Sequence, residues 1–198
     1  MMGDLARKVA QLMEELEYLH QLDDASRLHC GVPLKALEEL SCESLMDLMG
    51  PEPRLYASEI LYLRAGERHI HLEEREQLLL KSLRLLVSVK EEGILCEARA
   101  ARLKELKNTV LPLLNSADLL RCASFFQEGE RYNEMEDALF QAVERCADSH
   151  ERRQLIRLGS GLLAAAAESA SEHALIYCGM SRAELQQAAL DLAGLEMQ

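Results

Sequence analysis

Leucine and alanine recur every three or four positions along most of this chain, and that spacing is the strongest constraint on its fold. Residues at this spacing lie on one face of an α-helix, and an apolar face of that kind packs against another helix. No segment alternates apolar and polar residues for long enough to predict a strand, and no Asn-Gly or Asp-Gly turn joins two such segments. The sequence therefore predicts an all-α fold.

Glycine and proline divide the pattern into about nine or ten predicted helices. A leading amphipathic helix lies in residues 1–28, and the helix itself is expected to run from about Asp4 to Leu22. Near the other end, Ser181 and Glu184 form the capping-box pattern that begins a last helix. Short connections make consecutive helices antiparallel neighbours. We expect a single all-helical domain over residues 1–198, built from stacked antiparallel hairpins that form an α-α superhelix.

The leading helix carries five apolar residues at spacings of four, three, four and three. These are Leu5, Val9, Leu12, Leu16 and Leu19. The pattern covers about two heptads, whereas a coiled coil normally needs three or four. We therefore expect this helix to pack within its own domain, and a homodimer through its apolar face is the alternative.

Two later helices have predicted inward faces. In the helix expected at 72–91, this face consists of Leu72, Leu79, Leu83 and Leu86. In the helix expected at 150–168, it consists of Leu155, Leu158, Leu162 and Ala166. The second helix also contains Gly159, Gly161 and an alanine run at 164–167. These small residues form a thin surface that lets another helix approach closely.

The charge balance argues against nucleic acid as a partner. Acidic side chains outnumber basic ones by 34 to 22, for a net charge of −12, and an acidic chain repels phosphate. The densest basic cluster is spread around a helix, so we expect a solvated surface there. Its members are Arg99, Arg102, Lys104 and Lys107. A DNA-binding helix-turn-helix at 34–48 is excluded because its second helix offers acids where bases require donors.

The six cysteines lie singly, mostly among apolar helical residues. They are Cys30, Cys42, Cys96, Cys122, Cys146 and Cys178. Free cysteine behaves as a small buried hydrophobe, and regular disulfide frameworks belong to shorter secreted chains. The first residues lack a signal-peptide pattern, and no run of about 18 apolar residues occurs. We expect a cytoplasmic protein without a membrane partner.

One hairpin resembles a single tetratricopeptide repeat. Its small and aromatic residues fall at the packing positions of that repeat, namely Leu119, Cys122, Ala123, Phe126, Tyr132, Leu139 and Ala142. Small residues there let the two helices touch, and the aromatic rings fill the angle between them. Met135 replaces the usual alanine, and Gly129 comes one residue early. The resemblance implies a tetratricopeptide-like hairpin over 116–147.

The whole chain also resembles an uncharacterised bacterial family of tetratricopeptide-like helical proteins, known only as a domain of unknown function. The residues that carry this resemblance are Gly31-Val32-Pro33-Leu34, Leu45-Met46-Asp47-Leu48, Ala57-Ser58-Glu59-Ile60-Leu61 and the Tyr132 hairpin. The resemblance implies a stacked-hairpin fold and no activity, substrate or catalytic residue.

His69 and His71, with Glu73 and Glu74, form the densest group of potential metal ligands. Two histidines two positions apart cannot share a helix face, and acids are favoured in the first turn of a helix that begins here. We therefore expect polar turn residues and no bound metal. The chain also lacks the motifs of hydrolases, zinc proteases and phosphate-binding loops, so we expect neither an enzyme nor a cofactor.

In a stacked array of hairpins, the first helices of the pairs form a concave face. Aromatic and arginine side chains are favoured at the centres of interfaces. The predicted partner-binding residues on this face are Tyr56, Tyr62, Arg64, Arg121, Phe125 and Arg145. We expect a non-catalytic protein-interaction module or scaffold that binds a protein or peptide. The alternatives are a small-molecule or metal-dependent activity in an interhelical pocket, and a structural homodimer.

Overall fold

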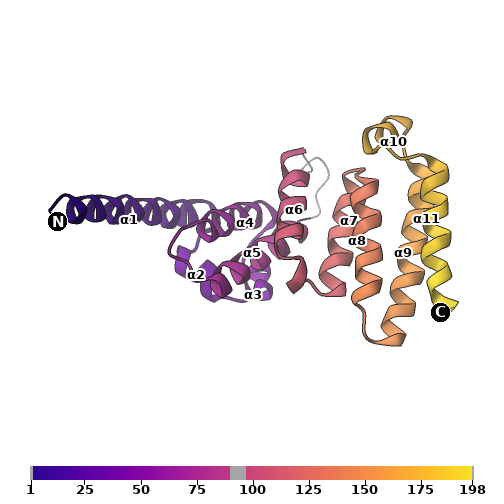
Figure 1. Ribbon diagram of the computed structural model, residues 1–198, viewed down its shortest axis with the longest axis horizontal. Helices are drawn as coiled ribbons and strands as arrows, with labels where there is room; N and C mark the ends of the chain where they lie inside the picture. The colour runs from indigo at the N-terminus through magenta and orange to yellow at the C-terminus, as the bar shows by residue number, and fades with distance from the viewer. Residues whose placement is uncertain (1, 90–96, 198) are drawn as a thin grey trace. The chain divides into compact units, whose positions relative to one another are not determined.

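The computed structural model describes the backbone of residues 2–89 and 97–197, and the side chains of 13–89 and 99–196. These residues form eleven α-helices and two short 3-10 helices, without a strand among them (Figure 1). The predicted all-α fold is confirmed. The count is slightly higher than the predicted nine or ten, and three of these helices have only six or seven residues.

Contacts within the chain group into two compact units, residues 1–89 and 90–198. The helices of the first unit are α1 (Met2–Cys30), α2 (Leu34–Glu39), α3 (Cys42–Leu48), α4 (Pro51–Ala65) and α5 (Leu72–Val87). The helices of the second unit are α6 (Glu97–Thr109), η1 (Leu111–Leu113), α7 (Ser116–Glu128), α8 (Tyr132–Arg145), α9 (Ser149–Ser169), α10 (Glu172–Cys178), α11 (Arg182–Gly194) and η2 (Leu195–Met197). The single domain over 1–198 stays a prediction, since two contact units can belong to one domain.

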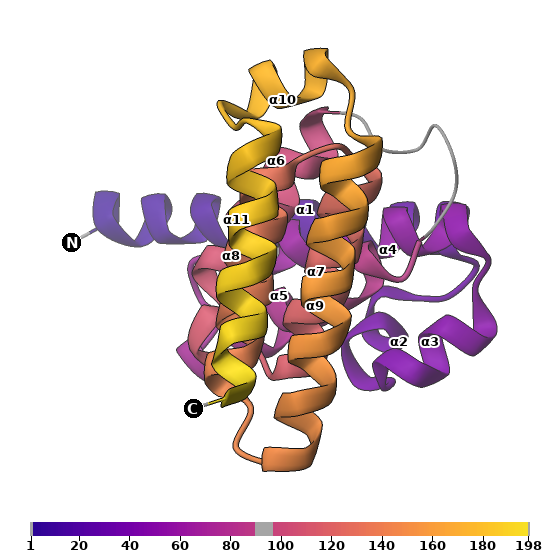
Figure 2. The same cartoon turned by 90° about the vertical axis from the view of Figure 1, so that its right-hand side faces the viewer.

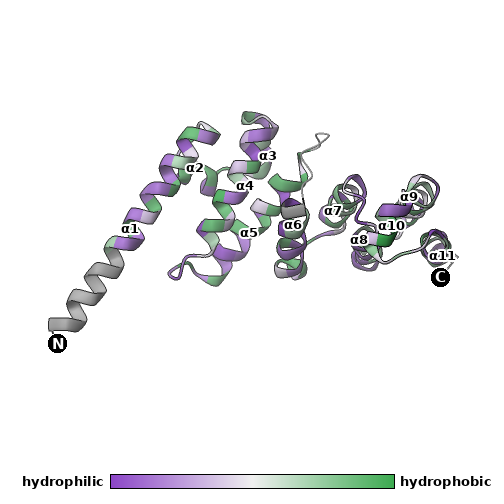
Figure 3. Cartoon of the chain, turned by 90° about the horizontal axis from the view of Figure 1, so that it is seen from above, coloured by the Kyte–Doolittle hydropathy of each residue, from purple (hydrophilic) through white to green (hydrophobic). Residues whose placement is uncertain are grey.

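In the first unit, α4 and α5 form an antiparallel hairpin, and α1 packs against α4 and α2 (Figure 3). Two buried serines join the hairpin reciprocally. Ser58 Oγ donates to the Ser82 carbonyl oxygen and Ser82 Oγ donates to the Ser58 carbonyl oxygen, both at 2.8 Å. Buried hydroxyls need such partners, and these short side chains also let the two helices lie close together.

Helix α1 extends eight residues beyond the expected end at Leu22, because no glycine or proline interrupts it before Gly31. Gly31 then adopts φ = +73°, a left-handed conformation that commonly ends a helix. At about 1.5 Å per residue, α1 is nearly twice as long as its neighbour α4, with 29 residues against 15. Part of α1 therefore extends past the hairpin it packs on.

In the second unit, α7 pairs with α8, and α9 pairs with α11 (Figure 2). Seen nearly end-on, these four helices follow one another in chain order (Figure 3). The seven residues expected to pack the α7–α8 hairpin are all buried: Leu119, Cys122, Ala123, Phe126, Tyr132, Leu139 and Ala142. The predicted hairpin at 116–147 thus has its expected core.

The inward face predicted for α9 is wrong by about one residue. Leu158 is exposed and Leu155 and Leu162 are half-buried, so that of the predicted four only Ala166 is fully buried. The buried face consists instead of Ile156, Gly159, Leu163, Ala166 and Ala167. Apolar residues surround much of this helix, so hydrophobicity alone does not fix its rotation. The rotation of α9 is set by the close approach of α11 at Gly159.

Two further expectations change. Leu72, expected in the α5 face with Leu79, is exposed because it is the first residue of the helix, and Ile70 before it is buried instead. The basic cluster on α6 is only partly solvated, since Lys107 is 4% exposed.

Side chains of residues 1–12, including most of the leading apolar stripe, lie outside the described residues. No helix in the described part of the chain has the length and hydrophobicity needed to cross a membrane.

Candidate interaction site

The three predicted partner-binding residues of the first unit all lie on α4. Tyr56 is exposed and stacks on His29, with ring centroids 4.3 Å apart. Tyr62 is half-buried. Arg64 is held between two carboxylates, donating to Glu38 Oε1 and to Glu67 Oε2 at 2.6 Å each. The arginine therefore serves to join α4 to α2 and to the following loop.

The other three lie on α7 and α8. Arg121 is exposed and lies 3.6 Å from the Asp118 carboxylate. Phe125 is only 4% exposed and belongs to the core of its unit. Arg145 donates to the carbonyl oxygens of Leu111 and Leu114, which fastens α8 to η1. The six residues do not form one exposed surface in either unit, and their role in partner binding stays a prediction.

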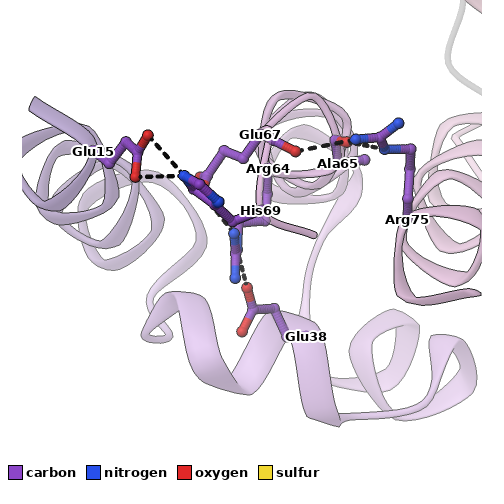
Figure 4. A network of polar contacts seen from close by, with 7 residues as sticks. All are labelled: Glu15, Glu38, Arg64, Ala65, Glu67, His69 and Arg75. Atoms are coloured by element: carbon purple, nitrogen blue, oxygen red, sulfur yellow. Dashed lines mark hydrogen bonds and ion pairs between the residues drawn. The ribbon is translucent and has the colours of Figure 1, made fainter. Parts of the chain in front are cut away.

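Of the potential metal ligands, His69 belongs to a polar network in the first unit (Figure 4). His69 Nε2 lies 2.9 Å from a carboxylate oxygen of Glu15, on α1. Arg75 donates to the carbonyl oxygens of Ala65 and Glu67 at 3.0 and 3.1 Å. Burial raises the pKa of Glu67, and the charge of Arg64 opposes this shift. The network fixes the α4–α5 loop against its neighbours.

Across the described residues, no three histidine, cysteine, aspartate or glutamate side chains come together as a metal site. His71 lies at the N-cap of α5, and Glu73 and Glu74 lie in the first turn. The metal-dependent alternative at His69 stays a prediction, which elemental analysis of purified protein tests.

A cavity of about 420 Å³ in the first unit lies beside Lys81, between α5 and the end of α2. The Lys81 ammonium group donates to three carbonyl oxygens at the end of α2, at 2.7–3.0 Å. These are carbonyls that the helix itself leaves unsatisfied. Burial lowers the pKa of Lys81, but all three of its donors are occupied, so its role is to cap α2.

In the second unit, Glu134 is the centre of a second polar network. It accepts from Lys104 on α6 at 3.0 Å and from Arg131 at 3.3 Å. Although burial alone would raise the pKa of Glu134, these two cations lower it. Arg131 also donates to the Tyr177 hydroxyl at 3.2 Å and lies over its ring. The network connects α6, α8 and α10, so these charges too have an internal role.

An acidic pocket of about 430 Å³ opens where α11 meets α8. Its carboxylates come from Glu136, Asp137, Glu184 and Asp191. Burial, followed by the charges of the other three acids, raises the pKa of Glu136. The ionised form of Glu136 is therefore destabilised in this pocket.

In the second unit, an apolar groove of about 570 Å³ lies between α9 and α11. We call it the α9–α11 groove. Its lining includes Arg157, Gly161, Ala164 and Glu168 from α9, and Ala189 and Leu190 from α11. Leu190 is 66% exposed, and a Cβ added at Gly161 would have no neighbouring atom within 4 Å. The groove therefore has small residues along its floor and the large apolar side chain of Leu190 beside them.

The sequence indicated part of this groove and missed the rest. The glycines and alanines of α9 predicted a close helix approach, and Gly159 provides one, since an added Cβ would lie 2.8 Å from Leu192 Cδ2. The opposite side of α9 provides the groove. Leu190 gave no signal, because an isolated leucine in a helix is normally assigned to the core.

Comparison with protein-family models, with curated proteins and with solved structures found no match. The resemblance to tetratricopeptide-like proteins therefore stays a prediction.

Proposed function

We propose that this chain is a non-catalytic protein-interaction module whose binding site is the α9–α11 groove. The observation that supports this most is Leu190, a leucine 66% exposed at the edge of an apolar groove on a charged chain. Exposed apolar grooves commonly mark places where a partner binds. Small residues along the floor suit a helix, because they let its backbone approach.

A photo-reactive amino acid at position 190 tests the proposal in the native cell. The matched control carries the same group at Gln187, which lines the acidic pocket and not the groove. We expect discrete crosslinked products from position 190 that are absent from position 187. Equal products from both positions, or none from either, contradict the proposed site.

We further propose that the hairpins are tetratricopeptide-like. The support is the α7–α8 hairpin, whose two helices pack together and in which four residues are buried: Ala123, Ala142, Phe126 and Tyr132. A crystal structure in which these hairpins lack the repeat's packing angle would contradict this assignment.

We also propose the cytoplasm as the compartment. The five cysteines in the described residues all carry free thiols, as a reducing environment would keep them. Burial raises the pKa of Cys30 to about 11 and that of Cys122 to about 12, which keeps both thiols protonated and unreactive. Thiol trapping in intact cells tests this: oxidised cysteines in the freshly trapped protein would contradict it.

A second candidate function, a structural homodimer through α1, is favoured by a separate observation. Met13 and Leu16 lie on α1 and are both about two-thirds exposed, with Leu16 at 65%. A Leu16→Asp variant, compared with Glu17→Asp at the neighbouring exposed position, tests it by light scattering. This candidate requires that Leu16→Asp alone converts a dimer to a monomer.

A further inference from the structure

We propose that the occupant of the α9–α11 groove is α9 of a second copy of this chain, packed antiparallel across a two-fold axis. This inference rests on the proposed function and names the partner of that site.

The charges of the groove are arranged to complement a rotated copy of themselves. Arg157, Gly161, Ala164 and Glu168 follow one another at spacings of four, three and four, so they share one face of α9. A two-fold axis midway between Gly161 and Ala164 places Arg157 opposite the partner's Glu168. The same axis places Gly161 opposite the partner's Ala164. In such an interface each contact occurs twice, which is the arrangement of a closed dimer.

The apolar part of the groove matches this axis. Gly159 lies against Leu192, and α9 and α11 are antiparallel, so Leu190 lies at about the level of Gly161. Leu190 therefore stands beside the smallest residues of the groove, next to the axis. The space over Gly161 is open, so a partner helix can enter until it meets Leu190. In such a dimer, a single interface would bury the Leu190 side chains of both copies.

The two charged ends are available for this pairing. Among the described residues, no side chain pairs with the Glu168 carboxylate, which lines the end of the groove. Arg157 donates from Nε to Glu196 at 2.9 Å, and its side chain remains 72% exposed. A guanidinium group carries several donors, so it can hold Glu196 and the partner's Glu168 together. Each end of the interface then holds one ion pair, between Arg157 of one copy and the partner's Glu168.

Sedimentation velocity over a concentration series tests the proposal with the full chain. We expect a monomer–dimer equilibrium for the wild type. Arg157→Glu and Glu168→Arg each place like charges in both contacts, so each should raise the dimer dissociation constant at least about tenfold. The double variant R157E/E168R restores opposite charges and should recover most of that loss. Lys35→Glu, an exposed charge reversal in the other unit, is the control and should change little.

Leu190→Asp provides an independent variant, since it alters the apolar part of the groove at a side chain that is 66% exposed. It should give a monomer with an unchanged circular dichroism spectrum. A wild type that is monomeric throughout the series overturns the inference, as does a double variant no better than either single one. A dimer that survives Leu190→Asp and is lost in Leu16→Asp also overturns it.

Failure of this inference is distinguishable from failure of the proposed function. If the chain is monomeric while position 190 still gives discrete crosslinks to a different protein, the second copy is excluded and the groove remains an interaction site. If position 190 gives no crosslinks, the groove itself is excluded.

Discussion

The inner and outer faces of α9 are built from similar small and apolar residues but have opposite surroundings. On the inner face, Gly159 lies against Leu139 of α8 and Leu192 of α11, and Leu163 is buried. On the outer face, Gly161 and Ala164 line an open groove beside the exposed Leu190. A glycine or alanine in a helix therefore does not by itself say whether the helix approach occurs within the chain or with a partner. Which of the two occurs depends on the residues that surround it in the folded structure.

The largest expected difference between the two faces concerns leucine truncation. Leu163 is 0% exposed, so Leu163→Ala should lower the free energy of unfolding by about 2–5 kcal/mol through lost contacts and a cavity. Leu190→Ala should change it by less than about 0.5 kcal/mol, because the side chain leaves no cavity. Urea unfolding at low protein concentration measures both. Equal losses would mean that Leu190 is part of the core after all.

A second, smaller difference concerns the two glycines. Gly161→Ala should stabilise the chain by up to about 1 kcal/mol, since alanine is the better helix former and its Cβ meets nothing. Gly159→Ala gains the same propensity, but its Cβ would lie 2.8 Å from Leu192 Cδ2 and 3.4 Å from Leu139 Cδ2. Overpacking of this kind costs about 1–3 kcal/mol. Thermal and urea unfolding should therefore rank Gly161→Ala above the wild type and Gly159→Ala below Gly161→Ala. The reverse order would contradict the assigned faces.

The smallest expected effect lies on the other edge of α11, in the acidic pocket. The pKa of Glu136 is raised above 4.5 by burial and by the neighbouring acids, so the folded state binds this proton more tightly than the unfolded state. The resulting stabilisation is complete below about pH 4.5 and is lost as the pH rises through the raised pKa. Glu136→Gln removes that loss, so its stability relative to wild type should be greater at pH 7 than at pH 4.

Urea unfolding at the two pH values checks this, with Glu144→Gln on the exposed side of α8 as the control for removing one charge. A Glu136→Gln advantage that is the same at both pH values, or larger at pH 4, would show that the pocket does not strain the ionised carboxylate.

Local signals predicted helix positions well. The capping box at Ser181 and Glu184 forms as expected and begins α11. The end of α1 was missed because the sequence between Leu22 and Gly31 holds no helix-breaking residue, and the apolar stripe was mistaken for the helix itself. Where a helix begins and ends depends on residues close together in the chain, so the sequence alone carries these signals.

The candidate site was harder to predict because it depends on contacts between helices. Arg64 and Arg145 were expected to face a partner, yet both are used to hold carboxylates or carbonyl oxygens of nearby segments. Leu190 and Glu168 were not singled out, since their importance comes from the rotation of α9 against α11. That rotation depends on the fit at Gly159, a tertiary property that periodicity does not encode.

The most direct test of the two-face account is a methyl NMR spectrum of leucine-labelled protein followed through a dilution series. The account predicts that the Leu190 methyl signals shift with concentration while those of Leu163 and Leu192 stay constant. Leu190 signals that do not move across the series, or inner-face signals that move with them, would contradict it.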